Sequence, residues 1–96
     1  WKVYMLLQNM MGRWTLPAYD RALARALVRR FPCADIIVFG HTHRFYQAYW
    51  GKTLLINPGA ALPTAYFNAP NIPSLAHLIL ESGKPPEVIE IRIQIP

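Results

Sequence analysis

Two histidines separated by one residue are the groups in this sequence best suited to chemistry. His41 and His43 stand in the segment Gly-His-Thr-His, directly after a short apolar run. Neutral imidazole is a common ligand for zinc, manganese and iron-type ions. On an extended strand the two rings would point the same way, whereas on a tight bend they can approach two neighbouring ions. Gly40 permits such a bend; two histidines satisfied by hydrogen bonds at a strand end are the structural alternative.

The apolar run before the histidines must position them. Residues 36–39 are continuously apolar and follow a helical pattern, which predicts a strand buried on both faces, as in an α/β sheet. Ligands bind at the carboxyl ends of strands in open α/β sheets, which is where the histidines fall. The helix is expected from Pro17 to Phe31, because apolar residues recur every four positions and Pro32 ends the pattern.

The other segments predict strands and turns. The expected strands are residues 2–7, 45–50, 53–57, 75–80 and 87–95. Residues 58–73 contain four prolines and are expected to form a loop. In the last strand, isoleucines alternate with polar residues, which predicts one buried face and one solvent-exposed face. The fold class expected is α/β, with two packed β-sheets flanked by helices.

Composition suggests that this domain has a further surface to cover. The chain has 96 residues, of which 53% are hydrophobic and 16% charged. A small domain has a proportionally large surface, so this balance predicts an apolar patch, a partner or a missing half. We expect residues 1–96 to be a single partial domain that exposes a sheet edge and associates with itself or is marginally stable.

Charge and cysteine usage narrow the class of protein. The net charge is +5, and four arginines (Arg21, Arg25, Arg29 and Arg30) lie on the expected helix. A solvated helix face is the preferred interpretation over a nucleic-acid-binding stripe, because no aromatic residues interleave the arginines. Cys33 is the only cysteine, which excludes an internal disulfide and favours a cytoplasmic protein. No apolar stretch is long enough to span a membrane.

Two motifs together resemble a known superfamily. The segments Gly-His-Thr-His-Arg (40–44) and Leu-Leu-Ile-Asn-Pro-Gly-Ala (54–60) are similar, in type and spacing, to the calcineurin-like metallophosphoesterases. The similarity is greatest to the small phosphodiesterase branch, which includes a retromer subunit. It extends from about residue 34 to residue 95. It implies a layered sandwich of two sheets, of which this chain would be the C-terminal half.

The resemblance also implies a site. His41 and His43 would each bind one of two divalent ions, of the manganese, zinc, iron or magnesium class. The substrate would be a phosphate ester, with Arg44, Asn57 and Gly59 as candidate substrate-binding residues. Alternatively, Arg44 is a surface arginine, and the Asn-Pro-Gly turn shapes the loop beside the site.

Several motifs that are usual in this superfamily do not occur in this sequence. The family motifs D-x-H, G-D-x-x-D and G-N-H-[DE] do not occur, so no catalytic residue is assigned, and Gln8 stands where a metal-binding histidine is usual. His77 is expected to be a packing or edge residue. Two hypotheses remain: an enzyme half that is inactive alone, with its N-terminal half as partner, or a degenerate module that binds a protein. Homo-oligomers fit either.

Overall fold

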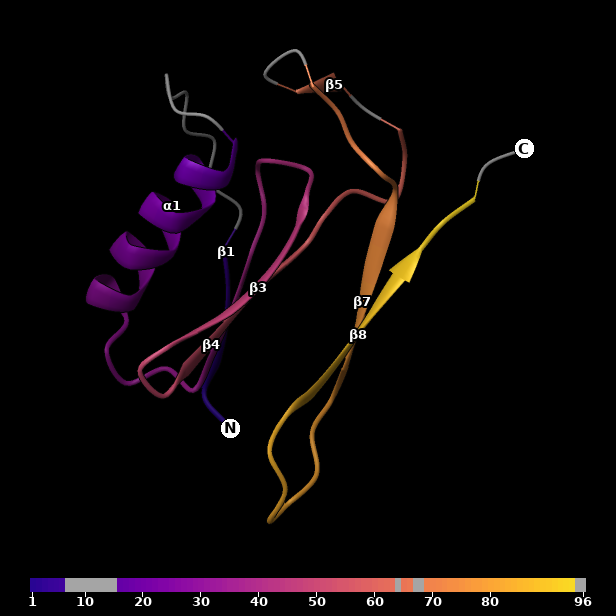
Figure 1. Cartoon of the computed structure of the whole chain (residues 1–96). Coiled ribbons are helices and arrows are strands. Elements are labelled where there is room, and N and C mark those ends of the chain that lie inside the picture. The colour runs from indigo at the N-terminus through magenta and orange to yellow at the C-terminus, as the bar shows by residue number, and fades with distance from the viewer. Residues whose placement is uncertain (7–15, 64, 67–68, 95–96) are drawn as a thin grey trace.

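The chain folds into three layers, in which a helix, a four-stranded sheet and a two-stranded ribbon lie side by side (Figure 1). The structure is a computed structural model that describes residues 1–6, 16–63, 65–66 and 69–94. Its elements are β1 (Val3–Leu6), α1 (Leu16–Arg30), β2 (Ile36–Phe39), β3 (Phe45–Trp50), β4 (Thr53–Pro58), β5 (Ala65–Tyr66), β6 (Ala69–Pro70), β7 (Ser74–Ile79) and β8 (Glu87–Arg92). The predicted α/β class with packed sheets is confirmed, with one helix among the described residues.

The central sheet has the strand order β1-β2-β4-β3. Strands β1, β2 and β4 run parallel, and β3 returns antiparallel to β4 through the predicted hairpin at Gly51. β2 is therefore an interior strand, which agrees with its continuous apolar sequence. Because β2 and β4 are parallel neighbours, their carboxyl ends bring the residues after Phe39 close to those at Asn57.

The two faces of the central sheet bury two separate cores. On one face, Ile37 and Leu55 pack with Leu23, Ala24 and Leu27 of α1. On the other face, neighbouring positions of the same strands pack against the ribbon (Ile36, Leu54 and Ile56 with Ala76, Leu78 and Val88). This alternation follows from the two-residue period of a strand. The helix carries its four arginines on its exposed side, as predicted.

The ribbon departs from the sequence prediction. In β8 the isoleucines were expected to face the core, but Ile89 and Ile91 are 40% and 42% exposed. Val88 faces the central sheet instead, opposite Leu78 in the antiparallel register. A strand of period two can bury only one of its faces against the sheet. The contacts of Val88 select the face opposite to the isoleucines.

Two further boundaries differ from expectation. Residues 58–73 were expected to be a loop, but they include the short paired strands β5 and β6. The last strand ends at Arg92 rather than at residue 95, although the amide of Ile93 still donates to the Pro73 carbonyl over 2.8 Å. The expected loop after β1, with Gln8, lies outside the described residues.

The central sheet is joined to the ribbon at a close contact around Gly59. The Ser74 hydroxyl donates to the Pro58 carbonyl over 2.7 Å, and the Ser74 amide donates to the Ala60 carbonyl over 2.9 Å. Gly59 has φ +81°, and a Cβ at this position would overlap the Ser74 hydroxyl. A side chain here would therefore disturb both the backbone and the contact between the layers.

Replacing this glycine should destabilise the fold far more than a matched change elsewhere. Gly51 also has a positive φ, of +62°, but a Cβ there would meet open space. We expect Gly51→Ala to lower the unfolding free energy by about 1–2 kcal/mol, the cost of the left-handed backbone, and Gly59→Ala to lower it further. Urea unfolding of both variants measures the difference. Equal losses would contradict the close contact between Gly59 and Ser74.

Candidate functional site

The two candidate metal ligands lie on a strained bend directly after β2. His41 has φ 112° and His43 has φ 59°, both in the region that side chains other than glycine rarely adopt. Both histidines are half-buried, and the Nε2 atom of His41 is shielded from solvent. Such backbone conformations cost about 1–3 kcal/mol each and persist only where surrounding contacts enforce them. The bend excludes the extended-strand arrangement of the two rings.

A buried chain of hydrogen bonds enforces the bend through the residue between the histidines. The Thr42 hydroxyl donates to Oδ1 of Asp20 over 3.0 Å, and it accepts from Nδ2 of Asn57 over 3.1 Å. All three side chains are at least 95% buried. The chain joins α1, the bend after β2 and the end of β4. Breaking any one link would leave polar groups unsatisfied away from water.

The same chain of hydrogen bonds continues into the Asn-Pro-Gly turn. Oδ1 of Asn57 accepts a hydrogen bond from the Gly59 amide over 3.0 Å. Asn57 thus uses both ends of its side-chain amide, one toward Thr42 and one toward its own turn. This arrangement gives Asn57 a positioning role for both motifs. Its predicted contact with substrate is not tested by the structure.

Burial changes the pKa of the Asp20 carboxylate, which lies at one end of this hydrogen-bond network. It raises the pKa of Asp20 above its ordinary value, because desolvation penalises the charged form. Hydrogen bonds from Thr42 and Asn57 and the positive charge of Arg44 act in the opposite direction but are smaller. The Asp20 carboxylate therefore holds the bend at a cost in desolvation.

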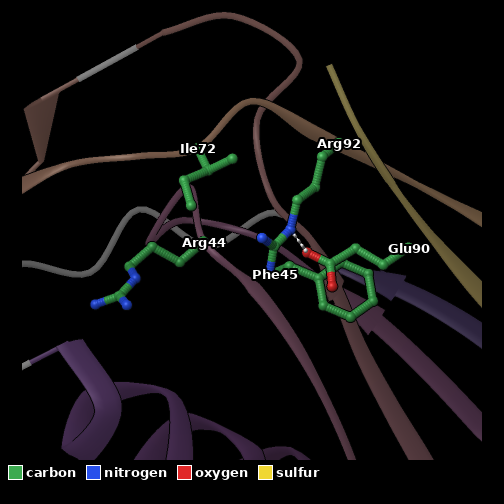
Figure 2. Close-up of a pocket in the computed structure, with 5 residues that line it drawn as sticks. All are labelled: Arg44, Phe45, Ile72, Glu90 and Arg92. Carbon is green, nitrogen blue, oxygen red and sulfur yellow. Dashed lines mark hydrogen bonds and ion pairs between the residues drawn. The ribbon is translucent and has the colours of Figure 1, made fainter. Parts of the chain in front are cut away.

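Arg44 lies beside the motif at the edge of a shallow hollow. The hollow has a volume of about 200 Å³ and is lined by Arg44, Phe45, Ile72, Glu90 and Arg92. Figure 2 shows the Arg44 guanidinium pointing away from Arg92, whose Nε atom lies 3.3 Å from Oε2 of Glu90. Arg44 is exposed. Its side chain is therefore accessible to an anionic group from solvent.

The two histidines are suitable metal ligands, but they do not form a complete metal site by themselves. Imidazole nitrogens suit zinc, manganese and iron-type ions. Within residues 1–6, 16–63, 65–66 and 69–94, however, no group of three histidine, cysteine, aspartate or glutamate side chains could hold an ion together. A zinc ion usually takes about four ligands. Any ion here would need donors other than those described.

The structure brings some of the predicted residues together and separates others. Asn57 and Gly59 meet the His41–His43 bend through Thr42. His77 lies on β7 with its side chain exposed, in agreement with the expected edge position. Sequence analysis missed Asp20, because it stands in none of the family's aspartate motifs. Its place on an otherwise apolar helix face, three residues before Leu23, was the available signal.

Fold and site define the class of protein: a layered α/β protein with a candidate ligand site at the carboxyl edge of its sheet. Residues 1–81 match the calcineurin-like phosphoesterase superfamily domain. This chain belongs to that superfamily. The prediction from the Gly-His-Thr-His and Asn-Pro-Gly motifs is thereby confirmed, although the match itself assigns no activity to the chain.

Solved structures named Vps29 share the fold. The chain is 20% identical to Vps29 from Entamoeba histolytica, crystallised with zinc, with a TM-score of 0.57, covering 90% of this chain and 54% of that one. Vacuolar protein sorting 29 from Cryptosporidium parvum is 26% identical, with a TM-score of 0.50, covering 93% and 52%. The chain thus spans about half the length of these relatives. A comparison with curated proteins found no match, and no described helix could cross a membrane.

Removing the hydroxyl between the histidines should destabilise the protein. Thr42→Val keeps the shape of the side chain but leaves Asp20 and Asn57 without their shared partner. We expect a loss of about 1–3 kcal/mol in the unfolding free energy, measured by urea denaturation. Thr42→Ser keeps the hydroxyl and serves as the matched control. A similar loss in both variants would show that the methyl group, rather than the hydrogen bonds, matters.

The raised pKa of Asp20 predicts a pH dependence of stability. A carboxyl whose pKa is higher in the folded state favours folding most when it is protonated. Its contribution therefore falls as pH rises through the folded pKa. We expect the unfolding free energy of the metal-free protein, minus that of Asp20→Asn, to decrease from acidic to neutral pH. Urea unfolding at several pH values checks this, and a difference that increases with pH would contradict it.

Proposed function

We propose that this chain supplies the histidine half of a metal-dependent phosphoesterase site, acting on phosphodiesters or phosphomonoesters. The observation that carries the proposal is the buried Asp20–Thr42–Asn57 chain. It holds His41 and His43 in backbone conformations that cost free energy. Strain of this kind clusters at active sites and ligand-binding sites, where the surrounding structure enforces it.

In this proposal His41 and His43 each hold one of two divalent ions, of the manganese, zinc, iron or magnesium class. Bound ions of this kind polarise phosphate oxygens and lower the pKa of a coordinated water. The Entamoeba histolytica Vps29 crystallised with zinc supports the ion class. The remaining ligands would come from an N-terminal half, with residues 1–96 as the C-terminal half of the domain. The chain alone is then expected to be inactive.

Arg44 would bind the phosphate group of the substrate in this site. Its guanidinium is accessible beside the bend, and its planar geometry suits two phosphate oxygens at once. Asn57 and Gly59 would contribute by fixing the turn next to the phosphate.

A cytoplasmic location remains a prediction from the single cysteine, Cys33.

Hydrolysis of a chromogenic phosphodiester, bis-p-nitrophenyl phosphate, tests the proposal. The assay uses the native gene product. Manganese or zinc is added, and a chelator serves as the control. We expect His41→Ala or His43→Ala to lower the metal-dependent rate at least about 100-fold. His77→Ala changes an exposed histidine on the ribbon and should leave the rate unchanged. Equal rates in all variants would refute the proposal.

A second candidate function is a protein-interaction module whose metal site has decayed. The observation that favours it is the exposed apolar face of β7 and β8, where Leu75, Ile89 and Ile91 are 40–46% exposed. The native gene product would then show no metal-dependent hydrolysis, even when its folding is intact by circular dichroism.

A further inference from the structure

The ribbon presents an open edge as well as an apolar face. Among the described residues, β8 pairs with β7 alone, so its other edge carries unpaired backbone groups. Leu75 and Ile91 lie opposite each other on the outer face, and Ile89 lies on the same face. An exposed strand edge beside apolar side chains favours pairing with another strand. This feature is independent of the histidine bend.

The hydrogen bonds to β7 show which backbone groups face the open edge. The Ile93 amide donates to the Pro73 carbonyl, and the same register continues as Ile91 opposite Leu75 and Ile89 opposite His77. Backbone groups alternate between the two sides of an antiparallel strand. The amides and carbonyls of Glu90 and Arg92 therefore point away from β7, toward the open edge.

We propose that β8 pairs antiparallel with β8 of a second copy of this chain, about a two-fold axis at Ile91. Glu90 then stands opposite Arg92 of the second copy, and their backbone groups exchange hydrogen bonds across the axis. Ile91 faces Ile91 of the second copy, and Ile89 faces Ile93 of the second copy. The contact is isologous, so the same strand supplies both halves of the interface.

Charge selects this register over its neighbours. Side chains opposite each other must share a face, so alternative registers differ by one residue in the position of the axis. An axis at Glu90 would place two glutamates opposite each other. An axis at Ile89 would place Glu87 opposite Ile91 and Glu90 opposite Val88. The axis at Ile91 alone pairs opposite charges twice and keeps isoleucine against isoleucine.

The charged groups are available for this exchange. Within one chain, Nε of Arg92 lies 3.3 Å from Oε2 of Glu90, and the two side chains are 65% and 33% exposed. An exposed pair of this kind contributes little to the stability of the monomer. In the dimer the same four groups alternate in sign across the axis. A second copy therefore fits the edge better than a partner of unrelated sequence.

Charge reversal tests the partner and the register together. We expect sedimentation velocity to show a concentration-dependent dimer of the full chain. Glu90→Arg and Arg92→Glu should each weaken dimerisation at least about tenfold, because like charges then face each other. An equimolar mixture of the two variants should form heterodimers, since every pair across the axis is again opposite in sign. Circular dichroism checks that each variant folds.

The outcomes of this experiment separate the possibilities. A chain that stays monomeric at every concentration would overturn the proposal, with Glu90 and Arg92 acting as charges that protect the edge. Dimers that persist in both single variants, or a mixture that fails to restore dimers, would overturn β8 pairing in this register. Restored heterodimers would support it even if each variant alone is less stable.

A disulfide across the axis gives a second, geometric test. Residues that face each other without exchanging backbone hydrogen bonds have Cα atoms about 4.5 Å apart, within reach of a disulfide. In a Cys33→Ser background, we expect Ile91→Cys to form a cross-linked dimer on mild oxidation. Ile89→Cys should cross-link poorly alone but well when mixed with Ile93→Cys. Equal self-linking at positions 89 and 91 would overturn the register.

Discussion

The hydrogen-bonded chain from Asp20 through Thr42 to Asn57 is the interaction on which the rest of the structure depends. It joins residues 22 and 15 positions apart, and so it connects the helix, the bend after β2 and the end of β4 at one point. Each of the three side chains satisfies another in a region closed to water. Such a network is either complete or costly, which makes it a strong constraint on the bend.

The constraint continues from the central sheet to the ribbon. Asn57 holds the Gly59 amide, Gly59 leaves room for Ser74, and Ser74 ties the start of β7 to Pro58. A line of polar contacts thus runs from α1 along the carboxyl edge of the sheet to the third layer. These contacts hold the start of β7 against the sheet, and Ile89 and Ile91 lie on the outward face of the neighbouring β8.

Much of this fold was predictable from local pattern. The apolar run of β2, the helical period of α1 and the turn at Gly51 each carry a strong signal, and the structure confirms all three. The predicted orientation of β8 was wrong, because the alternation of apolar and polar residues shows that the two faces differ without showing which of them meets the sheet. The four residues Val88 to Ile91 supply apolar groups to both faces. Tertiary contacts of Val88 with the apolar cluster of the central sheet decide between them.

The residues of the candidate site were named from the motifs, and their roles stay predictions, whereas the backbone geometry that holds them could not be predicted. The motifs placed His41, His43 and Asn57 together, but Gly40 was expected to make the bend. The positive φ angles fall on the histidines instead, and a long-range hydrogen-bond network holds Thr42 between them. That network uses Asp20, whose role no short motif reveals, because its partner lies 22 residues away.

Anomalous diffraction from crystals of the native gene product, grown with zinc, is the measurement that most directly tests whether this network builds a metal-binding bend. We predict density about 2.0–2.1 Å from a ring nitrogen of each histidine, His41 and His43. The positive φ angles and the Asp20–Thr42–Asn57 chain should be unchanged. An intact network with no zinc at either histidine would contradict this role and leave the bend a structural feature alone.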